Sequence, residues 1–70
     1  MRVNAKNLGY NIKKLRLGKG ISQEVLARQA NLRLSNLAKL EGGFNGNPTL
    51  ATLVALANVL GEGSIDQLLK

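Results

Sequence analysis

Residues that carry catalytic or metal-binding chemistry are scarce in this chain of 70 residues. Cysteine and histidine are both absent. Their absence removes disulfides, thiolate and imidazole metal ligands, and the side chain most often used as a general base. Only four residues are acidic, which disfavours a carboxylate metal site or a paired general acid and base. We therefore expect no enzymatic activity, no cofactor and no metal.

Basic side chains are abundant and unevenly distributed. Residues 1–40 hold nine Lys and Arg residues against one acidic residue, Glu24, and so carry a net charge of +8. Residues 41–70 hold Lys70 against three acidic residues and carry −2. A strongly basic half predicts an electrostatic surface for a polyanion such as nucleic acid. A basic surface that serves only solubility has the same composition, so charge alone leaves both readings open.

The length and composition predict one small domain over residues 1–70. Hydrophobic residues make up 44% of the chain, which favours a packed core over disorder. Only Tyr10 and Phe44 are aromatic, so the core must consist of aliphatic side chains. The chain has no apolar run long enough to span a bilayer and no signal-peptide pattern at its start. We therefore expect a cytoplasmic protein without a membrane partner.

Hydrophobic periodicity predicts five short helices and no strand, so the fold is expected to be all-α. The first helix is expected at about 5–17, where Gly9 is costly for a helix and marks a close contact with another helix. The second should begin after Ser22, a good N-cap, and run to about Ala30. The third should cover about 34–41 and end in two glycines. Short connections between these helices favour a compact bundle.

The last third of the chain predicts two further helices. Thr49 is the expected N-cap of one that ends at Gly61. A capping box formed by Ser64 and Gln67 is expected to open the other. The first of these two helices should bury a nearly continuous apolar face, made of Leu50, Leu53, Leu56, Ala57 and Leu60.

Residues 23–42 have the spacing of a helix-turn-helix, in which two helices cross closely around a tight turn. Ala27 is small enough for the close crossing. Asn31 is one of the few residues other than glycine that accept the positive φ of such a turn. Apolar residues that can tie both helices to the core are Leu26, Leu32, Leu37 and Leu40. An ordinary helical hairpin has the same spacing, so the pattern by itself leaves that alternative open.

Four stretches together resemble the phage-repressor/Cro-like helix-turn-helix family, the xenobiotic-response-element type of bacterial transcriptional regulator: NIKKLRLGKGISQEVLARQA, NLAKLEGG, NPTLATLVALANVLG and SIDQLL. The likeness covers about residues 7–69. It implies a compact five-helix bundle like that of lambda repressor, with the helix at 34–41 in the major groove of double-stranded DNA. The protein would be a sequence-specific transcriptional regulator or repressor. We expect a homodimer on DNA, because one recognition helix reads too few base pairs to specify a site.

The resemblance also implies roles for individual residues. Gln23 corresponds to a glutamine that clamps a DNA phosphate, at a helix start whose free N–H groups attract phosphate. The loop at 43–47 would bring backbone N–H groups to the phosphates. Arg16 and Glu41 match a pair that family members often bury as a salt bridge. The residues that we expect to contact DNA are Ser22, Gln23, Arg33, Leu34, Ser35, Asn36, Lys39 and Asn45.

Two positions depart from the usual pattern of the family. Arg33, a poor N-cap, stands where many members have Ser or Thr, although it can still reach a phosphate. Leu34 stands where many members have a polar residue that reads bases. A leucine can pack on a thymine methyl but cannot read a donor or an acceptor. Two alternatives stay open: Leu34 packs against the loop around Phe44, or the chain is an antitoxin-like protein-interaction module with weak or no DNA binding.

Overall fold

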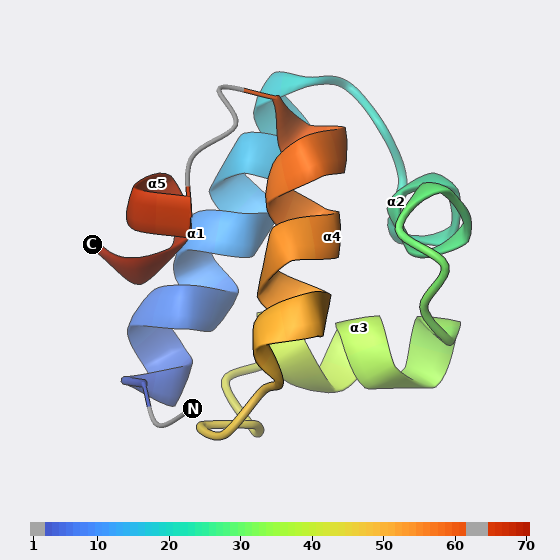
Figure 1. Cartoon of the computed structure of the whole chain (residues 1–70). Coiled ribbons are helices and arrows are strands. Elements are labelled where there is room, and N and C mark those ends of the chain that lie inside the picture. Colours follow the sequence, from blue (N-terminus) through green and yellow to red (C-terminus); the bar gives the residue numbers. More distant parts are fainter. Residues whose placement is uncertain (1–2, 62–64) are drawn as a thin grey trace.

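Helices α1 and α4 lie side by side in the computed structural model, which describes residues 3–61 and 65–70 (Figure 1). Helix α5 packs against one side of α1, and α2 and α3 lie on the other side of the molecule, nearly perpendicular to each other. The described residues contain no strand, which confirms the all-α prediction. The helices are α1 (Ala5–Gly18), α2 (Gln23–Gln29), α3 (Leu34–Glu41), α4 (Leu50–Leu60) and α5 (Ile65–Leu69).

Side chains at the helix starts explain why the helices begin where they do. The hydroxyl oxygen of Ser22 accepts a hydrogen bond from the backbone N–H of Val25 at 3.1 Å, and Thr49 does the same for Thr52 at 3.1 Å. Each hydroxyl satisfies a donor that has no partner inside its helix. Both predicted N-caps are thus confirmed. Ser64 lies outside the described residues, so the expected capping box at α5 stays a prediction.

The turn between α2 and α3 has the predicted left-handed residue. Asn31 adopts a φ of 57°, a conformation that asparagine accepts at lower cost than most residues with a side chain. The backbone N–H of Leu32 then donates to the carbonyl of Ala27 at 2.8 Å, which closes the turn. Ala27 itself is only 3% exposed, as a close crossing of the two helices requires.

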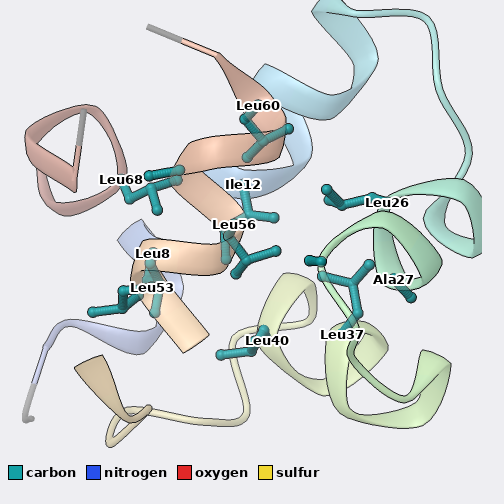
Figure 2. Close-up of a cluster of buried hydrophobic side chains, with 12 residues drawn as sticks. Leu8, Ile12, Leu26, Ala27, Leu37, Leu40, Leu53, Leu56, Leu60 and Leu68 are labelled. Carbon is teal, nitrogen blue, oxygen red and sulfur yellow. The ribbon is translucent and has the colours of Figure 1, made fainter. Parts of the chain in front are cut away.

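All five helices contribute to one aliphatic core (Figure 2). One predicted core residue is wrong, because the side chain of Leu50 is 58% exposed. Leu50 is the first residue of α4, and helical side chains lean toward the N-terminus. Its side chain therefore leans toward the loop before α4 and away from the core. The buried apolar residues are Leu8, Ile12, Leu26, Ala27, Ala30, Leu37, Leu40, Leu53, Leu56, Ala57, Leu60 and Leu68.

Helix α1 meets the end of α3 backbone to backbone at Gly9. A Cβ atom at this position would overlap the carbonyl oxygen of Leu40 and lie 2.8 Å from that of Glu41. Such contacts are too short for any side chain, so only glycine allows this approach. The predicted close helix contact is confirmed, and it fixes the C-terminal end of α3 against α1.

Candidate nucleic-acid interface

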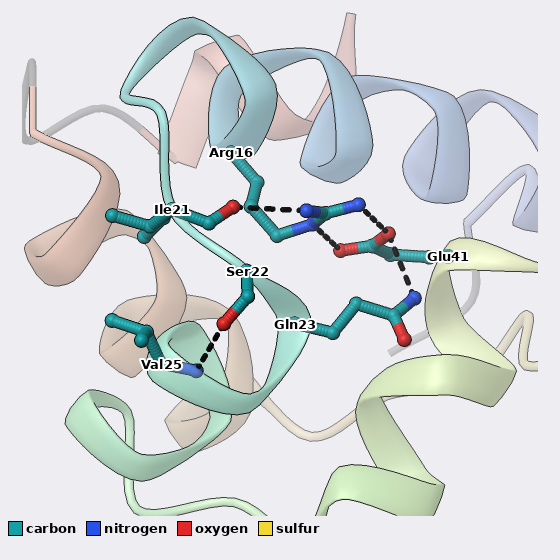
Figure 3. Close-up of polar contacts among 6 residues, drawn as sticks. All are labelled: Arg16, Ile21, Ser22, Gln23, Val25 and Glu41. Atoms are coloured by element: carbon teal, nitrogen blue, oxygen red, sulfur yellow. Dashed lines mark hydrogen bonds and ion pairs between the residues drawn. The ribbon is translucent and has the colours of Figure 1, made fainter.

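Arg16 at the end of α1 and Glu41 at the end of α3 form a buried ion pair (Figure 3). The Nε of Arg16 donates to one carboxylate oxygen of Glu41 at 2.7 Å, and Nη2 donates to the other at 3.0 Å. The two side chains are 10% and 3% exposed. A two-pronged contact of this kind is the strongest geometry that arginine offers a carboxylate. Arg16 is consequently no part of the exposed basic surface.

The ion pair also fixes the start of α2. The Nη1 of Arg16 donates to the backbone carbonyl of Ile21 at 2.9 Å, just before the N-cap Ser22. The side-chain amide of Gln23 donates to the Oε1 of Glu41 at 3.0 Å. We call Arg16, Gln23 and Glu41 the polar cluster. It connects three helices, so the start of α2 and the end of α3 are held in one fixed relation (Figure 3).

Gln23 is half-buried and already oriented by this contact. Its amide nitrogen carries two N–H groups, and only one of them is needed for the bond to Glu41. The second N–H can donate to an anion without disturbing the polar cluster. The hydroxyl oxygen of Ser22 accepts from the backbone of Val25, which leaves its own O–H able to donate. The start of α2 therefore offers two polar donors at one place.

Helix α3 has one buried side and one exposed side. Leu37 and Leu40 are buried in the core. The sequence-predicted residues on the other side are all exposed: Leu34, Ser35, Asn36 and Lys39. Arg33, which precedes the helix, is also exposed and makes no side-chain cap. The exposed side thus combines a hydroxyl, an amide, a cation and an apolar side chain within two turns.

Leu34 is 44% exposed, so it lies outside the core as the sequence suggested. It does not pack against the loop residue Phe44. The ring of Phe44 lies over Gly42 at the far end of α3, since a Cβ at Gly42 would come within 2.8 Å of two ring atoms. Gly42 is eight positions after Leu34, which corresponds to about 12 Å along the helix axis. The structure therefore removes one of the alternatives for Leu34.

The loop between α3 and α4 is shaped by its own hydrogen bonds. The side-chain oxygen of Asn45 accepts from the backbone N–H of Asn47 at 2.9 Å, so this oxygen is used within the loop. The carbonyl of Gly46 accepts from the N–H of Val3, which ties the loop to the start of the chain at 2.9 Å. Asn45 is half-buried, and its side chain shapes the loop, a role that the sequence did not indicate.

The described ranges, 3–61 and 65–70, contain neither a membrane-spanning helix nor a cluster of metal-binding side chains. None of their helices has the length and apolar character needed to cross a membrane. No group of three or more acidic, histidine or cysteine side chains there could hold a metal ion.

The chain is similar to a known protein family and to known structures. A family model described as helix-turn-helix matches residues 12–68. The restriction-modification controller protein C.AhdI from Aeromonas hydrophila is 31% identical, with a TM-score of 0.83 over 91% of this chain and 94% of that chain. A hypothetical transcription factor, NHTF from Neisseria, is 33% identical, with a TM-score of 0.86 over 96% of this chain and 75% of that chain. A comparison with curated proteins gave no significant match.

The family match covers most of the chain and includes all of α2, the turn and α3. One neighbour is described as a controller protein and the other as a transcription factor, and together with the family match they support a DNA-binding regulator. The alternative of an ordinary helical hairpin is excluded. This chain belongs to the Cro/C1-type helix-turn-helix family.

Proposed function

We propose that this chain is a sequence-specific DNA-binding protein that regulates transcription by placing α3 in the major groove. The observation that carries the proposal is the way α3 is held. Its inner side is fixed by the contact at Gly9 and by the polar cluster, while its outer side is exposed along the whole helix. A helix that enters the major groove must be held in a fixed orientation and must expose polar side chains to the base edges.

Residues at the start of α2 and before α3 position the protein on the DNA backbone. Gln23 donates its second amide N–H to a phosphate. The hydroxyl of Ser22 is the second donor available to a phosphate at the same helix start. Arg33 reaches a phosphate beside α3, and the loop that contains Asn45 presents backbone N–H groups to another. Contacts of this kind fix the orientation of a protein on DNA but carry no direct sequence information.

Side chains on the exposed side of α3 read the base edges. Ser35 and Asn36 exchange hydrogen bonds with bases, and Lys39 donates to a guanine or to a phosphate at the groove edge. Leu34 packs on a thymine methyl, the one apolar group that the major groove displays. Leu34 therefore selects a base by contact area where other family members use a hydrogen bond.

The proposed regulator binds as a homodimer and acts as a repressor. One α3 helix covers only a few base pairs, so two related copies are needed to specify a site. We assign the dimer contact to the end of α4 and to α5, because the C-terminal half of the chain is slightly acidic and is not needed for the basic surface. The two α3 helices then lie about 34 Å apart, one turn of B-DNA.

The test is selection of binding sites from random double-stranded oligonucleotides, followed by affinity measurements over a range of salt concentrations. We expect one enriched sequence whose affinity falls steeply with salt, with a log–log slope of about −0.9 for each phosphate neutralised. Failure to enrich any sequence would overturn the proposal.

A second candidate function is an antitoxin-like module that binds another protein. The observation in its favour is the exposure of two apolar side chains, Leu34 at 44% and Phe44 at 83%. A protein interface built on these side chains would bury apolar area. Its affinity would change little with salt, unlike that of a contact with several phosphates. The salt titration therefore separates the two functions.

A further inference from the structure

Phe44 is the most exposed of the large hydrophobic residues in the described part of the chain. It is 83% exposed, although the core of this small domain contains no aromatic side chain at all. A single exposed apolar residue is common on protein surfaces and by itself indicates nothing. The local structure around Phe44, however, places its ring against the end of α3.

Two features locate Phe44 and its ring at the end of α3. The backbone N–H of Phe44 donates to the carbonyl of Lys39 at 3.0 Å, which keeps this residue bound to the last turn of the helix. The ring lies against Gly42, where a Cβ would come within 2.8 Å of its Cδ2 and Cε2 atoms. Any residue with a side chain at position 42 would push the ring away. The glycine therefore makes room for an aromatic side chain that remains almost entirely in solvent.

The ring also continues an apolar row on the exposed side of α3. Leu34, Ala38 and Gly42 follow one another at intervals of four residues, so they lie along one line of the helix surface. The ring of Phe44 lies against Gly42, at the end of this line. This apolar row begins at Leu34, which we assign to base reading, and ends at the exposed ring of Phe44.

A lysine stands beside the loop that carries the ring. Gly43 packs against Lys6, and a Cβ at Gly43 would lie 3.4 Å from the Cα and Cγ atoms of Lys6. Lys6 is exposed, so its ammonium group is available to an anion near this loop. An exposed ring and an exposed cation from another helix therefore share one end of α3.

We infer that Phe44 packs against a deoxyribose of the DNA backbone and that Lys6 holds a phosphate nearby. This inference rests on the proposed function, in which α3 lies in the major groove. The first residues of a recognition helix meet the bases, so its last turn and the following loop meet the backbone at the groove edge. There the DNA offers apolar sugar faces between phosphates. An apolar ring next to a lysine matches that alternation.

The test compares Phe44→Ala and Phe44→Leu with the parent on the selected duplex and on a scrambled duplex, at several salt concentrations. We expect Phe44→Ala to bind both duplexes about tenfold more weakly, the effect of losing a partly buried apolar side chain. The salt slope should not change, because the ring releases no counterions. Phe44→Leu should keep most of the affinity, since a sugar needs apolar area and not an aromatic face.

Two further variants, Lys6→Ala and Tyr10→Ala, are compared with the Phe44 variants. Lys6→Ala should weaken binding to both duplexes and reduce the magnitude of the salt slope by about 0.9, the mark of one lost phosphate contact. Tyr10→Ala is the matched control. Tyr10 is the other aromatic residue of the chain and is 65% exposed, and the hollow beside it is lined by residues of α1 alone, Lys13, Lys14 and Leu17. We expect Tyr10→Ala to bind like the parent.

Several outcomes would overturn the inference. Equal binding by Phe44→Ala and the parent would mean that the ring touches no DNA. A loss confined to the selected duplex would indicate contact with a base, and a Phe44→Leu protein as weak as Phe44→Ala would indicate stacking on an unpaired base. An equal loss in Tyr10→Ala would show that the effect is not local. A parent that binds neither duplex would instead refute the proposed function itself.

Discussion

Arg16 and Glu41 lie 25 positions apart in the sequence, and their side chains meet in a two-pronged ion pair between α1 and α3. Both are nearly buried, and Glu41 also accepts the amide of Gln23. In a domain without disulfides, this ion pair is a polar link that complements the aliphatic core. Replacing either residue should therefore disturb the packing of three helices and also the proposed phosphate contact of Gln23.

Glu41→Ala should destabilise the fold strongly. The substitution leaves the guanidinium of Arg16 nearly buried without its carboxylate, and breaking a buried pair in this way costs about 3 kcal/mol of unfolding free energy. Replacing both residues by apolar ones should recover much of that loss, because no uncompensated charge remains. Urea unfolding followed by circular dichroism measures both effects.

Glu24→Ala is the control for Glu41→Ala, because Glu24 is an exposed acidic residue in the first turn of α2. Its loss should change the unfolding free energy by at most about 0.5 kcal/mol, as is usual for exposed sites. A Glu41→Ala protein that unfolds like Glu24→Ala would show that the ion pair contributes little.

Gly9→Ala should also destabilise the fold, and for a steric reason. The new methyl group would overlap the carbonyl oxygen of Leu40, and neither backbone can move without separating α1 from α3. Overpacking of this kind typically costs about 1–3 kcal/mol. Gly18→Ala is the matched control in the same helix, because nothing lies within 4 Å of the added Cβ. There we expect a gain of about 0.4–1 kcal/mol, since alanine restricts the unfolded chain. Thermal unfolding of both variants should therefore show melting temperatures that move in opposite directions.

Gln23→Ala should weaken binding to every DNA sequence by a similar factor, because a phosphate contact positions the protein without specifying bases. The measurement is the ratio of affinities of parent and variant on the selected duplex and on a scrambled one. Gln29→Ala, at the exposed end of the same helix, controls for loss of a glutamine from α2. A loss that is confined to the selected duplex would assign Gln23 to base reading, and no loss on either duplex would remove the phosphate contact.

The selected DNA site should have inverted symmetry, with half-sites whose centres lie about 34 Å apart. Two copies of the chain should occupy it, as sedimentation of the complex would show. Asp66→Lys in α5 changes a charge in the segment that we assign to the dimer contact. It should reduce the cooperativity of binding to the full site while leaving affinity for an isolated half-site nearly intact. A selected site without any symmetry would contradict the dimer.

Local features of the fold could be predicted from the sequence, and features that depend on distant segments could not. The N-caps Ser22 and Thr49 act on residues only three positions away, and the left-handed turn at Asn31 follows from the properties of one residue. Periodicity assigns Leu50 to the apolar face of α4, but it does not show that the side chain of this first helical residue leans toward the preceding loop and is exposed.

The candidate site shows the same division. The exposed side of α3 follows from the burial of Leu37 and Leu40, which the apolar spacing indicated. The bond between Gln23 and Glu41 joins residues 18 positions apart, and nothing in their sequence neighbourhood required it. The position of the Phe44 ring over Gly42 depends on the path of the loop, so the sequence left its role open.

The contact that most distinguishes the proposed reading of DNA is the one between Leu34 and a thymine methyl. Leu34→Ala should reduce affinity for the preferred site by about 1 kcal/mol, the effect of a buried methyl group or two. Replacing the thymine by uracil removes only the methyl group, and the parent should lose a similar amount. The Leu34→Ala protein should be almost indifferent to that replacement, because its partner atoms are already gone. These four affinities form a double-mutant cycle, which isolates the contact from any general effect on the fold. Strictly additive losses would mean that the leucine and the methyl group do not touch, and the exposed Leu34 would then indicate a protein partner.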